Sequence, residues 1–234
     1  MSGDAYATCL AALGRLDTCT VSNAVETFGR RLRNEGFMDS GVRCLFPQLP
    51  PMVGHAAPIR IRTSSPPTQG AAYFDRTDLW DYILSLPAPR VLVAEDVDER
   101  PGFGALYGEV HANILQALGC VGLVTNGAVR DLPQVANLGF HFFARNPAVS
   151  HAFSHIVEFG QPVKVAGLAV KPGELLHGDA HGVLSIPAEI ACDVPLVAAL
   201  IREREQRVID LCRRGSFTQE RLRAELRGIQ SEHS

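Results

Sequence analysis

The sequence lacks several patterns that would assign it to a large class of proteins. None of its six cysteines forms a Cys-x-x-Cys pair, so we expect reduced thiols rather than a zinc site or a disulfide framework. The formal net charge of -3 provides no basic field for nucleic acid. No apolar run approaches the ~20 residues needed to span a bilayer, and no signal-peptide pattern opens the chain. These absences favour a cytoplasmic protein that binds neither nucleic acid nor a membrane.

Common catalytic motifs are also missing. There is no Gly-x-Ser-x-Gly elbow, and the glycines of residues 102–108 have the wrong spacing for a dinucleotide loop. His151 and His155 lie four residues apart, but without the Glu of a His-Glu-x-x-His motif we expect boundary positions rather than metal ligands. His177 to His181 forms a His-Gly-Asp-Ala-His segment, which fits a turn better than a metal site.

The 234 residues, 46% hydrophobic and 20% charged, suit a globular protein with a sizeable core. Helical periodicity predicts helices over residues 6–16, 17–29, 79–86, 108–118, 132–137, 194–211 and 217–226. Strand patterns cover residues 53–63, 90–94, 121–125, 141–144, 163–170, 175–176 and 183–186. Crossover units followed by short strands indicate an α/β or α+β body with more than one sheet layer.

The stretch from Gly122 to Asp131 carries the strongest local signal. An apolar run predicts a buried strand, Asn126-Gly127 predicts a tight turn, and Arg130 and Asp131 follow side by side. A strand that ends at a turn and presents a fixed cation beside a carboxylate can build a small-molecule site. Taken alone, the stretch fits a charged surface turn equally well.

A second candidate feature is Gly108, which can begin a helix. The amides of Glu109, Val110 and His111 would then point toward the helix start, where they can bind an anion such as a substrate carboxylate. The alternative is simple capping of the helix.

In combination these residues resemble the RraA-like family, the class II metal-dependent pyruvate aldolases exemplified by 4-hydroxy-4-methyl-2-oxoglutarate aldolase. The resemblance covers about residues 15–190 and rests on motifs in a fixed order. The motifs are Asp17-Thr18-x-Thr20-Val21-Ser22, Gly108-Glu109, Gly119 and Gly122, Val124-x-Asn126-Gly127-x-Val129-Arg130-Asp131, Pro162-Val163, Val170-x-Pro172-Gly173-Glu174, and Gly178-Asp179-x-x-Gly182-Val183 before Pro187.

The resemblance implies an α/β fold of the three-layer β/β/α swivelling-domain type, with a helical C-terminal arm. We expect a single domain over residues 1–234, with N-terminal helices at 5–29, a core at 53–190 and C-terminal helices at 194–228. The resemblance also implies a homotrimer or a hexamer with sites between subunits.

The family's site implies a function for the motif residues. Members bind pyruvate through the helix-start amides and the motif Arg, and they bind a divalent metal through the motif Asp. Matching by position gives catalytic roles to Arg130 and Asp131, substrate binding to Gly108, Glu109, Val110, His111 and Arg130, and the metal to Asp131. The metal would be Mg²⁺, Mn²⁺ or another divalent ion. The implied reaction is cleavage of a 4-hydroxy-2-oxo acid to pyruvate, with oxaloacetate decarboxylation through the same enolate.

Four positions depart from the family pattern and border the expected pocket. Members often have Asp at Asn126 and His181 and an acidic residue at Asn23, while His111 stands where an apolar residue is usual. These departures bear on the choice of substrate. The alternative function is that of a non-catalytic regulator that binds a ribonuclease or another protein partner, as some members do. The Arg130-Asp131 pair favours the aldolase.

Overall fold

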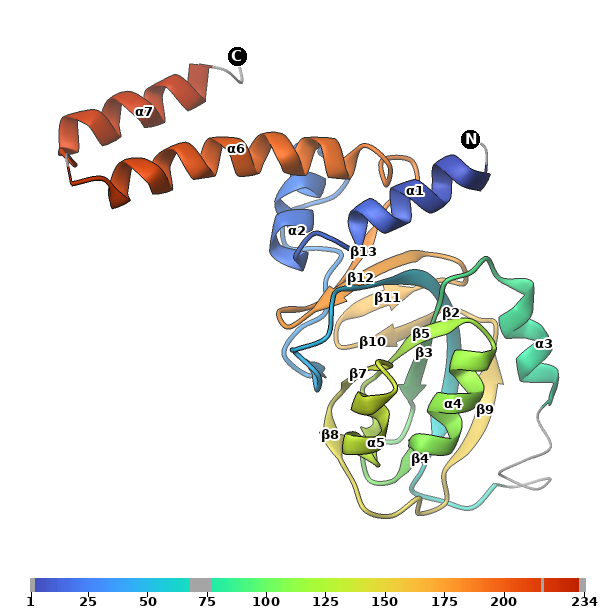
Figure 1. The fold of residues 1–234 in the computed structure, drawn as a ribbon. Coiled ribbons are helices and arrows are strands. Elements are labelled where there is room, and N and C mark those ends of the chain that lie inside the picture. Colours follow the sequence, from blue (N-terminus) through green and yellow to red (C-terminus); the bar gives the residue numbers. More distant parts are fainter. Residues whose placement is uncertain (1–2, 68–76, 216, 232–234) are drawn as a thin grey trace.

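The computed structural model describes residues 3–67, 77–215 and 217–231, and an eight-stranded mixed sheet forms its centre (Figure 1). Its strands run in the order β1-β7-β5-β3-β2-β12-β13, and β9 also pairs with β2. Their bounds are β1 Arg43–Cys44, β2 Met52–Arg62, β3 Arg90–Asp96, β5 Cys120–Thr125, β7 His141–Ala144, β9 His155–Phe159, β12 Leu175–Asp179 and β13 Gly182–Ile186.

Strands β2, β3, β5 and β7 pair in parallel at the centre of this sheet. The outer pairs, β1 with β7, β9 with β2, and β12 with β2 and β13, are antiparallel. Val91, Leu92, Val93 and Ala94 of β3 are all fully buried. Both faces of the sheet are therefore covered, as near-continuous apolar runs in parallel strands require.

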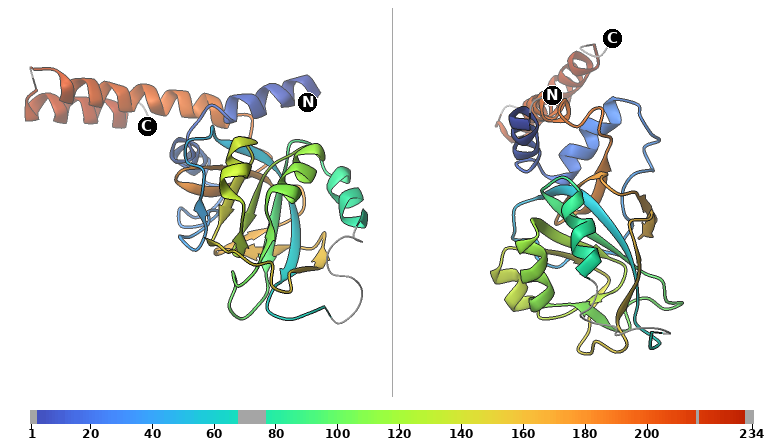
Figure 2. Two further views of the ribbon diagram at one scale, coloured as in Figure 1. Left: turned by 60° about the horizontal axis from the view of Figure 1, so that its bottom comes forward. Right: turned by 90° about the vertical axis from the view of Figure 1, so that its right-hand side faces the viewer.

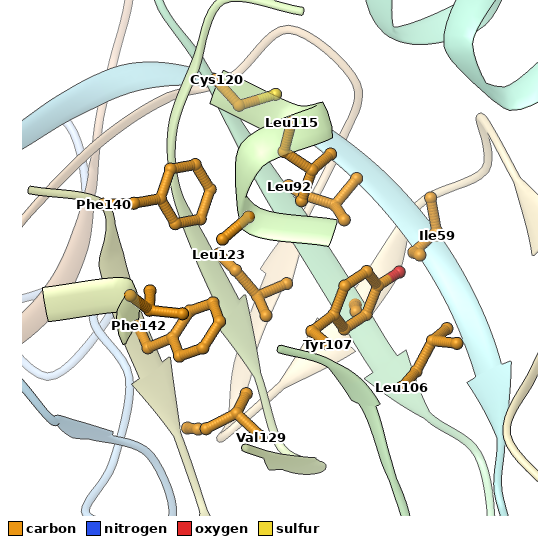
Figure 3. Packing of buried hydrophobic residues seen from close by; sticks show 14 of the residues in the cluster. Ile59, Leu92, Leu106, Tyr107, Leu115, Cys120, Leu123, Val129, Phe140 and Phe142 are labelled. Carbon is orange, nitrogen blue, oxygen red and sulfur yellow. The ribbon is translucent and has the colours of Figure 1, made fainter. Parts of the chain in front are cut away.

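Helices cover one face of the sheet. They are α3 Thr77–Ser85, α4 Glu109–Ala117 and α5 Leu132–Asn137, all close to the helices predicted from periodicity. Figure 3 shows Leu92 and Leu123 of the sheet beneath Leu115 of α4, with Tyr107 and Phe142 alongside. This core fixes the start of α4 over the ends of the parallel strands.

A β-hairpin covers part of the other face. The single strand expected over residues 163–170 is wrong, because the chain turns back at Ala166-Gly167 to give β10 Val163–Val165 and β11 Leu168–Val170. Ala166 and Gly167 have φ of 44° and 82°, and two positive φ angles are the geometry of a type I′ hairpin. The sheet therefore lies between the hairpin on one face and the helices on the other, which is the expected three-layer β/β/α arrangement.

A second group of helices packs against β12 and β13. It consists of α1 Gly3–Leu13, α2 Thr18–Thr27 and the first half of α6 Val194–Arg213. The expectation of free thiols is wrong for Cys9 and Cys192, which form a disulfide with Cα atoms 5.2 Å apart. The packing of α1 against the turn before α6 brings them together across 183 residues, and no local spacing could reveal such a pair.

The C-terminal helices form the expected arm. Helix α6 continues beyond the body and α7 Gln219–Ser231 folds back along it, so that both project away from the sheet (Figures 1 and 2). An ion pair between Arg207 Nε and Glu225 Oε1, 2.6 Å apart, joins the two helices. Within the described part of the chain, no helix has the length and hydropathy to cross a membrane.

Candidate functional site

Three short strands carry the candidate site. β4 Ala105–Tyr107, β6 Ala128–Val129 and β8 Asn146–Pro147 form a small parallel sheet. Each follows one of the parallel strands β3, β5 and β7 along the chain, so the small sheet lies at their carboxyl ends. Ligands in open α/β sheets bind at this edge.

The Asn126-Gly127 pair joins β5 to β6 as a bend and is not the tight turn expected from sequence. Neither residue has the positive φ that a type I′ turn requires. Instead, the Asn126 side chain bridges to the end of β3: its Oδ1 accepts from the Asp96 amide at 2.7 Å and its Nδ2 donates to the Asp96 carbonyl at 3.0 Å. The bend therefore aligns two neighbouring strands and carries the chain on to Arg130.

Asp131 is held in an uncommon backbone conformation at the start of α5. Its φ of 55° and ψ of 40° lie in the left-handed region, which residues other than Gly, Asn and Asp seldom adopt. The Arg130 amide donates to the Tyr107 carbonyl at 3.0 Å, and this bond fixes the chain just before the turn. Backbone strain of this kind collects at functional sites.

The Asp131 carboxylate lies at the start of α4. The Glu109 amide donates to its Oδ2 at 3.0 Å and Arg130 Nε donates to its Oδ1 at 3.2 Å. The first hydrogen bond of α4 runs from the Ala112 amide to the Gly108 carbonyl, so the amides of Glu109, Val110 and His111 all precede it. The structure thus brings the predicted amides, cation and carboxylate together, with the Glu109 amide directed at Asp131.

Gly108 is required by this arrangement. A Cβ built on it would lie 2.3 Å from Asp131 Oδ2 and 2.8 Å from Arg130 Cγ. Its φ of -150° is ordinary extended backbone, so the need for glycine is one of space and not of conformation. Any larger residue would push the carboxylate from the helix start.

Hydrogen bonding and charge keep Asp131 ionised. Partial burial raises the pKa of its carboxyl, but the Glu109 amide and the Arg130 guanidinium outweigh this effect and hold the pKa below its usual value. The nearby His151 adds in the same direction. The side chain is 30% exposed, so the carboxylate is both charged and accessible.

Two histidines flank the start of α4. Burial, with a contribution from His151, lowers the pKa of His111 to about 4, so this imidazole is neutral at neutral pH. Its ring meets Tyr107 edge-on with centroids 5.5 Å apart. His151 Nδ1 lies 2.6 Å from the Ala105 carbonyl oxygen, which can only accept, so Nδ1 carries the proton.

A hollow of about 430 Å³ opens beside the Arg130-Asp131 pair. Arg130, Asp131, Leu132, Pro147, Ala148 and Val149 line it. This volume is ample for a small organic acid.

The donor chemistry of the site fits a hard divalent cation. Asp131 offers an ionised carboxylate at the edge of the hollow, in a cradle that a Cβ at position 108 would fill. Among the residues that the structure describes, no three His, Cys, Asp or Glu side chains gather where they could hold a metal. A cation at Asp131 would therefore take its other ligands from water and substrate oxygens, as Mg²⁺ commonly does.

The other histidines that the sequence singled out lie elsewhere. His177 is fully buried, with Nε2 3.2 Å from the Leu13 carbonyl and Nδ1 3.0 Å from Thr18 Oγ1. Asp179 accepts from the Thr18 amide and from His181. These contacts join α1 and α2 to β12. His155 begins β9, and neither it nor His151 lies on a helix.

Comparison with known proteins decides the family. A family model described as RraA-like, Aldolase/RraA, matches residues 18–185. The chain belongs to the RraA-like family. The matched region runs from the first residue of α2 to β13, so it includes every residue of the candidate site.

Two RraA-like relatives share the name "Putative 4-hydroxy-4-methyl-2-oxoglutarate aldolase". The protein from Halalkalibacterium halodurans is 32% identical over 84 residues, which are 36% of this chain and 40% of the relative. The protein from Ectopseudomonas mendocina is 30% identical over 115 residues, and the match covers 43% of this chain and 70% of the relative. The chain is thus similar, at 30% to 32% identity, to proteins named as putative aldolases.

A solved structure shows the same fold. Streptomyces coelicolor RraAS2 is described as an unusual member of the RNase ES inhibitor RraA protein family. It superposes with a TM-score of 0.66 at 19% identity, and the match covers 91% of this chain and 99% of that chain. The likeness of fold therefore covers nearly the whole of this chain.

The sequence did not point to the wall of the hollow, and it predicted only a boundary position for His151. Pro147, Ala148 and Val149 reach the site only through the parallel pairing of β6 with β8. A signal was present in the apolar Pro-Ala-Val run directly after a buried strand, at the sheet edge where ligands bind.

Proposed function

We propose that this RraA-like chain is a divalent-metal-dependent aldolase that cleaves 4-hydroxy-2-oxo acids to pyruvate and also decarboxylates oxaloacetate. The observation that carries the proposal is the ionised Asp131 carboxylate, which lies between the Arg130 guanidinium and the Glu109 amide at the edge of an open hollow. The family match and the names of the aldolase relatives support it.

In this proposal each site residue has a separate task. Asp131 holds Mg²⁺ or Mn²⁺, which supplies Lewis-acid chemistry for a 2-oxo acid when bound. The amides of Val110 and His111 bind the substrate carboxylate at the start of α4, where the helix dipole favours negative charge. The Glu109 amide serves the site by holding Asp131 in place.

Arg130 stabilises the charge that develops on the substrate. When the C3–C4 bond breaks, the 4-hydroxyl loses its proton, its oxygen becomes a carbonyl, and the electron pair of the bond moves into the pyruvyl fragment as an enolate. The Arg130 guanidinium stays protonated and donates hydrogen bonds to the enolate oxygen. A proton added at C3 completes pyruvate. Loss of CO₂ from oxaloacetate leaves the same enolate, so one arrangement serves both reactions.

The test is pyruvate release by the purified protein. We expect pyruvate from 4-hydroxy-2-oxoglutarate, its 4-methyl derivative or oxaloacetate with Mg²⁺ present, followed through NADH oxidation by lactate dehydrogenase. Chelation with EDTA should abolish the release, and added Mg²⁺ or Mn²⁺ should restore it. Failure to release pyruvate from any 4-hydroxy-2-oxo acid or oxaloacetate with metal present would contradict the proposal. The proposal includes a homotrimer or hexamer in the cytoplasm, and analytical ultracentrifugation tests the assembly.

A second candidate is a non-catalytic regulator that binds a ribonuclease or another protein. The observation that favours it is the projecting arm of α6 and α7, where Leu200, Ile209 and Leu226 remain exposed. Deletion of residues 194–234 separates the two functions if the remaining body stays folded, as circular dichroism would show. A regulator that binds through the arm would lose its partner, while pyruvate release by the body would identify the enzyme.

A further inference from the structure

The hollow beside Arg130 and Asp131 has two chemically different ends. One end carries the charged pair, Arg130 and Asp131. The other is formed by Leu132, Pro147, Ala148 and Val149, all of which are hydrocarbon side chains. A substrate that places its 2-oxo acid group at the charged end therefore directs the remainder of the molecule along an apolar wall.

Backbone pairing builds this wall and engages part of its polar backbone. Pro147 lies opposite Val129 in the parallel pair of β6 and β8, and a proline has no N–H to offer. The Ala148 amide donates to the Val129 carbonyl at 2.9 Å, and the Ala105 amide donates to the Ser150 carbonyl at 2.9 Å. The side chains that the wall presents to the hollow are all hydrocarbon.

The charges around the hollow disfavour a second substrate carboxylate. Among the described residues that line it, Arg130 is the one cation, and Asp131 already forms an ion pair with it. His111 is neutral at neutral pH, and Glu109 adds a negative charge in the first turn of α4. A second carboxylate would lose water at the wall without gaining a counter-charge from the residues that form the wall.

The geometry points to an apolar subsite for the group on C4, so that this chain prefers 4-hydroxy-2-oxo acids with an uncharged alkyl group there over those with a second carboxylate. This inference rests on the proposed aldolase function. The reaction converts R–CHOH–CH₂–CO–COO⁻ into the aldehyde R–CHO and pyruvate: the C3–C4 bond breaks, the hydroxyl proton leaves, and C3 gains a proton. Oxaloacetate should have a raised KM, although its departing carboxylate loses charge as CO₂ forms.

Two substrates of nearly equal shape test the preference on the purified protein in its own assembly. 4-Hydroxy-2-oxopentanoate carries a methyl group on C4, and 4-hydroxy-2-oxoglutarate carries a carboxylate there. We expect kcat/KM to be at least about tenfold higher for the methyl substrate, the scale of discrimination that one small group provides. Pyruvate is the common product, so a single assay serves both substrates.

A cation placed on the wall should reverse the preference. Val149 is 94% exposed, so Val149→Arg is expected to fold normally. We expect this variant to favour the dicarboxylate by about tenfold or more, because the new guanidinium can pair with the second carboxylate. The matched control is Val157→Arg on β9, at a position 47% exposed and outside the lining of the hollow, which should keep the original preference.

The outcomes separate the two claims. If neither acid yields pyruvate and oxaloacetate is also inert, the aldolase proposal itself fails. If both are cleaved and the dicarboxylate is preferred by the unmodified protein, the aldolase stands and the apolar subsite is wrong. An unchanged preference in Val149→Arg, with normal folding, would also overturn the placement of the alkyl group on this wall.

Discussion

Asp131 and Asp179 make the same local contact at opposite ends of the molecule, yet their surroundings differ. Each accepts a backbone N–H from the start of a helix: Asp131 from Glu109 of α4 at 3.0 Å, and Asp179 from Thr18 of α2 at 2.8 Å. Asp179 Oδ1 also accepts from the amide of His181 and lies 3.1 Å from the His181 Nδ1. The Asp179 side chain is 10% exposed. Asp131 is 30% exposed and faces the hollow.

The two carboxylates differ in how far protein donors already occupy their oxygens. Protein donors surround both oxygens of Asp179, and the neighbouring His177 is buried with both ring nitrogens engaged. That set of contacts joins two helices to β12 and leaves little room for a ligand. The Asp131 carboxylate is partly exposed and lines the hollow, beside a cation and the start of a helix. The same contact thus serves stability in one place and, in our proposal, chemistry in the other.

Exchanging each carboxylate for its amide should give the largest effects, on activity at Asp131 and on stability at Asp179. Asp131→Asn is expected to lower pyruvate release at least about a hundredfold, with little change in the free energy of unfolding, because the metal ligand is lost from an accessible position. Asp179→Asn should lower the free energy of unfolding by about 2–3 kcal/mol, because a buried acceptor of charge-assisted hydrogen bonds is lost. Urea unfolding and the coupled pyruvate assay measure both. Full activity in Asp131→Asn would contradict the catalytic role that separates Asp131 from Asp179.

A methyl group at Gly108 should sharpen the comparison next. In Gly108→Ala the added Cβ displaces the Asp131 carboxylate from the helix start, since it would lie 2.3 Å from Oδ2. We expect a fall in kcat of about tenfold to a hundredfold, typical of misplaced catalytic groups. Gly14→Ala is the control, because its nearest contact would be an ordinary 3.6 Å, and it should leave kcat unchanged. Equal activity in the two variants would show that the position of Asp131 is not critical.

Replacing Arg130 by lysine tests the cation with its charge retained. Lysine cannot reproduce the planar fork of donors, so Arg130→Lys should lower kcat by about tenfold while changing KM less. Arg145→Lys, at an exposed position that follows β7, is the matched control. A larger rise in KM than fall in kcat would assign Arg130 to ground-state binding instead.

The smallest expected effect is a change in the pH dependence of stability at the other end. Burial lowers the pKa of His177, although the Leu13 carbonyl and Asp179 oppose this shift. As the pH falls below about 6.5, the unfolded chain takes up a proton that the folded chain does not, so the free energy of unfolding should decrease. His55, His111 and His141 have lowered pKa values too and contribute in the same sense.

His177→Gln removes one of these four groups and should make the slope between about pH 5 and 7 shallower, by at most about 1.4 kcal/mol per pH unit, the largest slope that one titrating group can give. Urea unfolding at a series of pH values measures the slope. An unchanged slope would mean that His177 titrates alike in the folded and unfolded chain.

Local patterns predicted much of the site because its main residues are neighbours in sequence or begin a helix with a clear sequence signal. Gly108 begins α4 as expected, and Arg130-Asp131 follows β5 through a short bend. The family resemblance then assigned both to one substrate site. The contact of the Asp131 carboxylate with the Glu109 amide was not predicted, because it depends on how α4 and α5 lie side by side.

Turn chemistry misled at two positions. Asn126-Gly127 has the composition of a type I′ hairpin but forms a bend, because β6 runs on to a parallel partner and not back along β5. Ala166-Gly167 lacks that composition and yet forms the hairpin, because the apolar sides of β10 and β11 pack together on the sheet. In both cases tertiary packing outweighed local preference.

The disulfide between Cys9 and Cys192 has a topological consequence. It closes the main chain into a covalent ring that contains the whole central sheet, Asp131 and Asp179, while α6 and α7 extend from the ring as a tail. After a single protease cut within the ring, the two pieces stay joined by the disulfide until a reductant is added. A cut between α6 and α7 instead leaves α7 held by non-covalent contacts alone. Gel mobility with and without reductant therefore distinguishes a nick in the body from a nick in the arm.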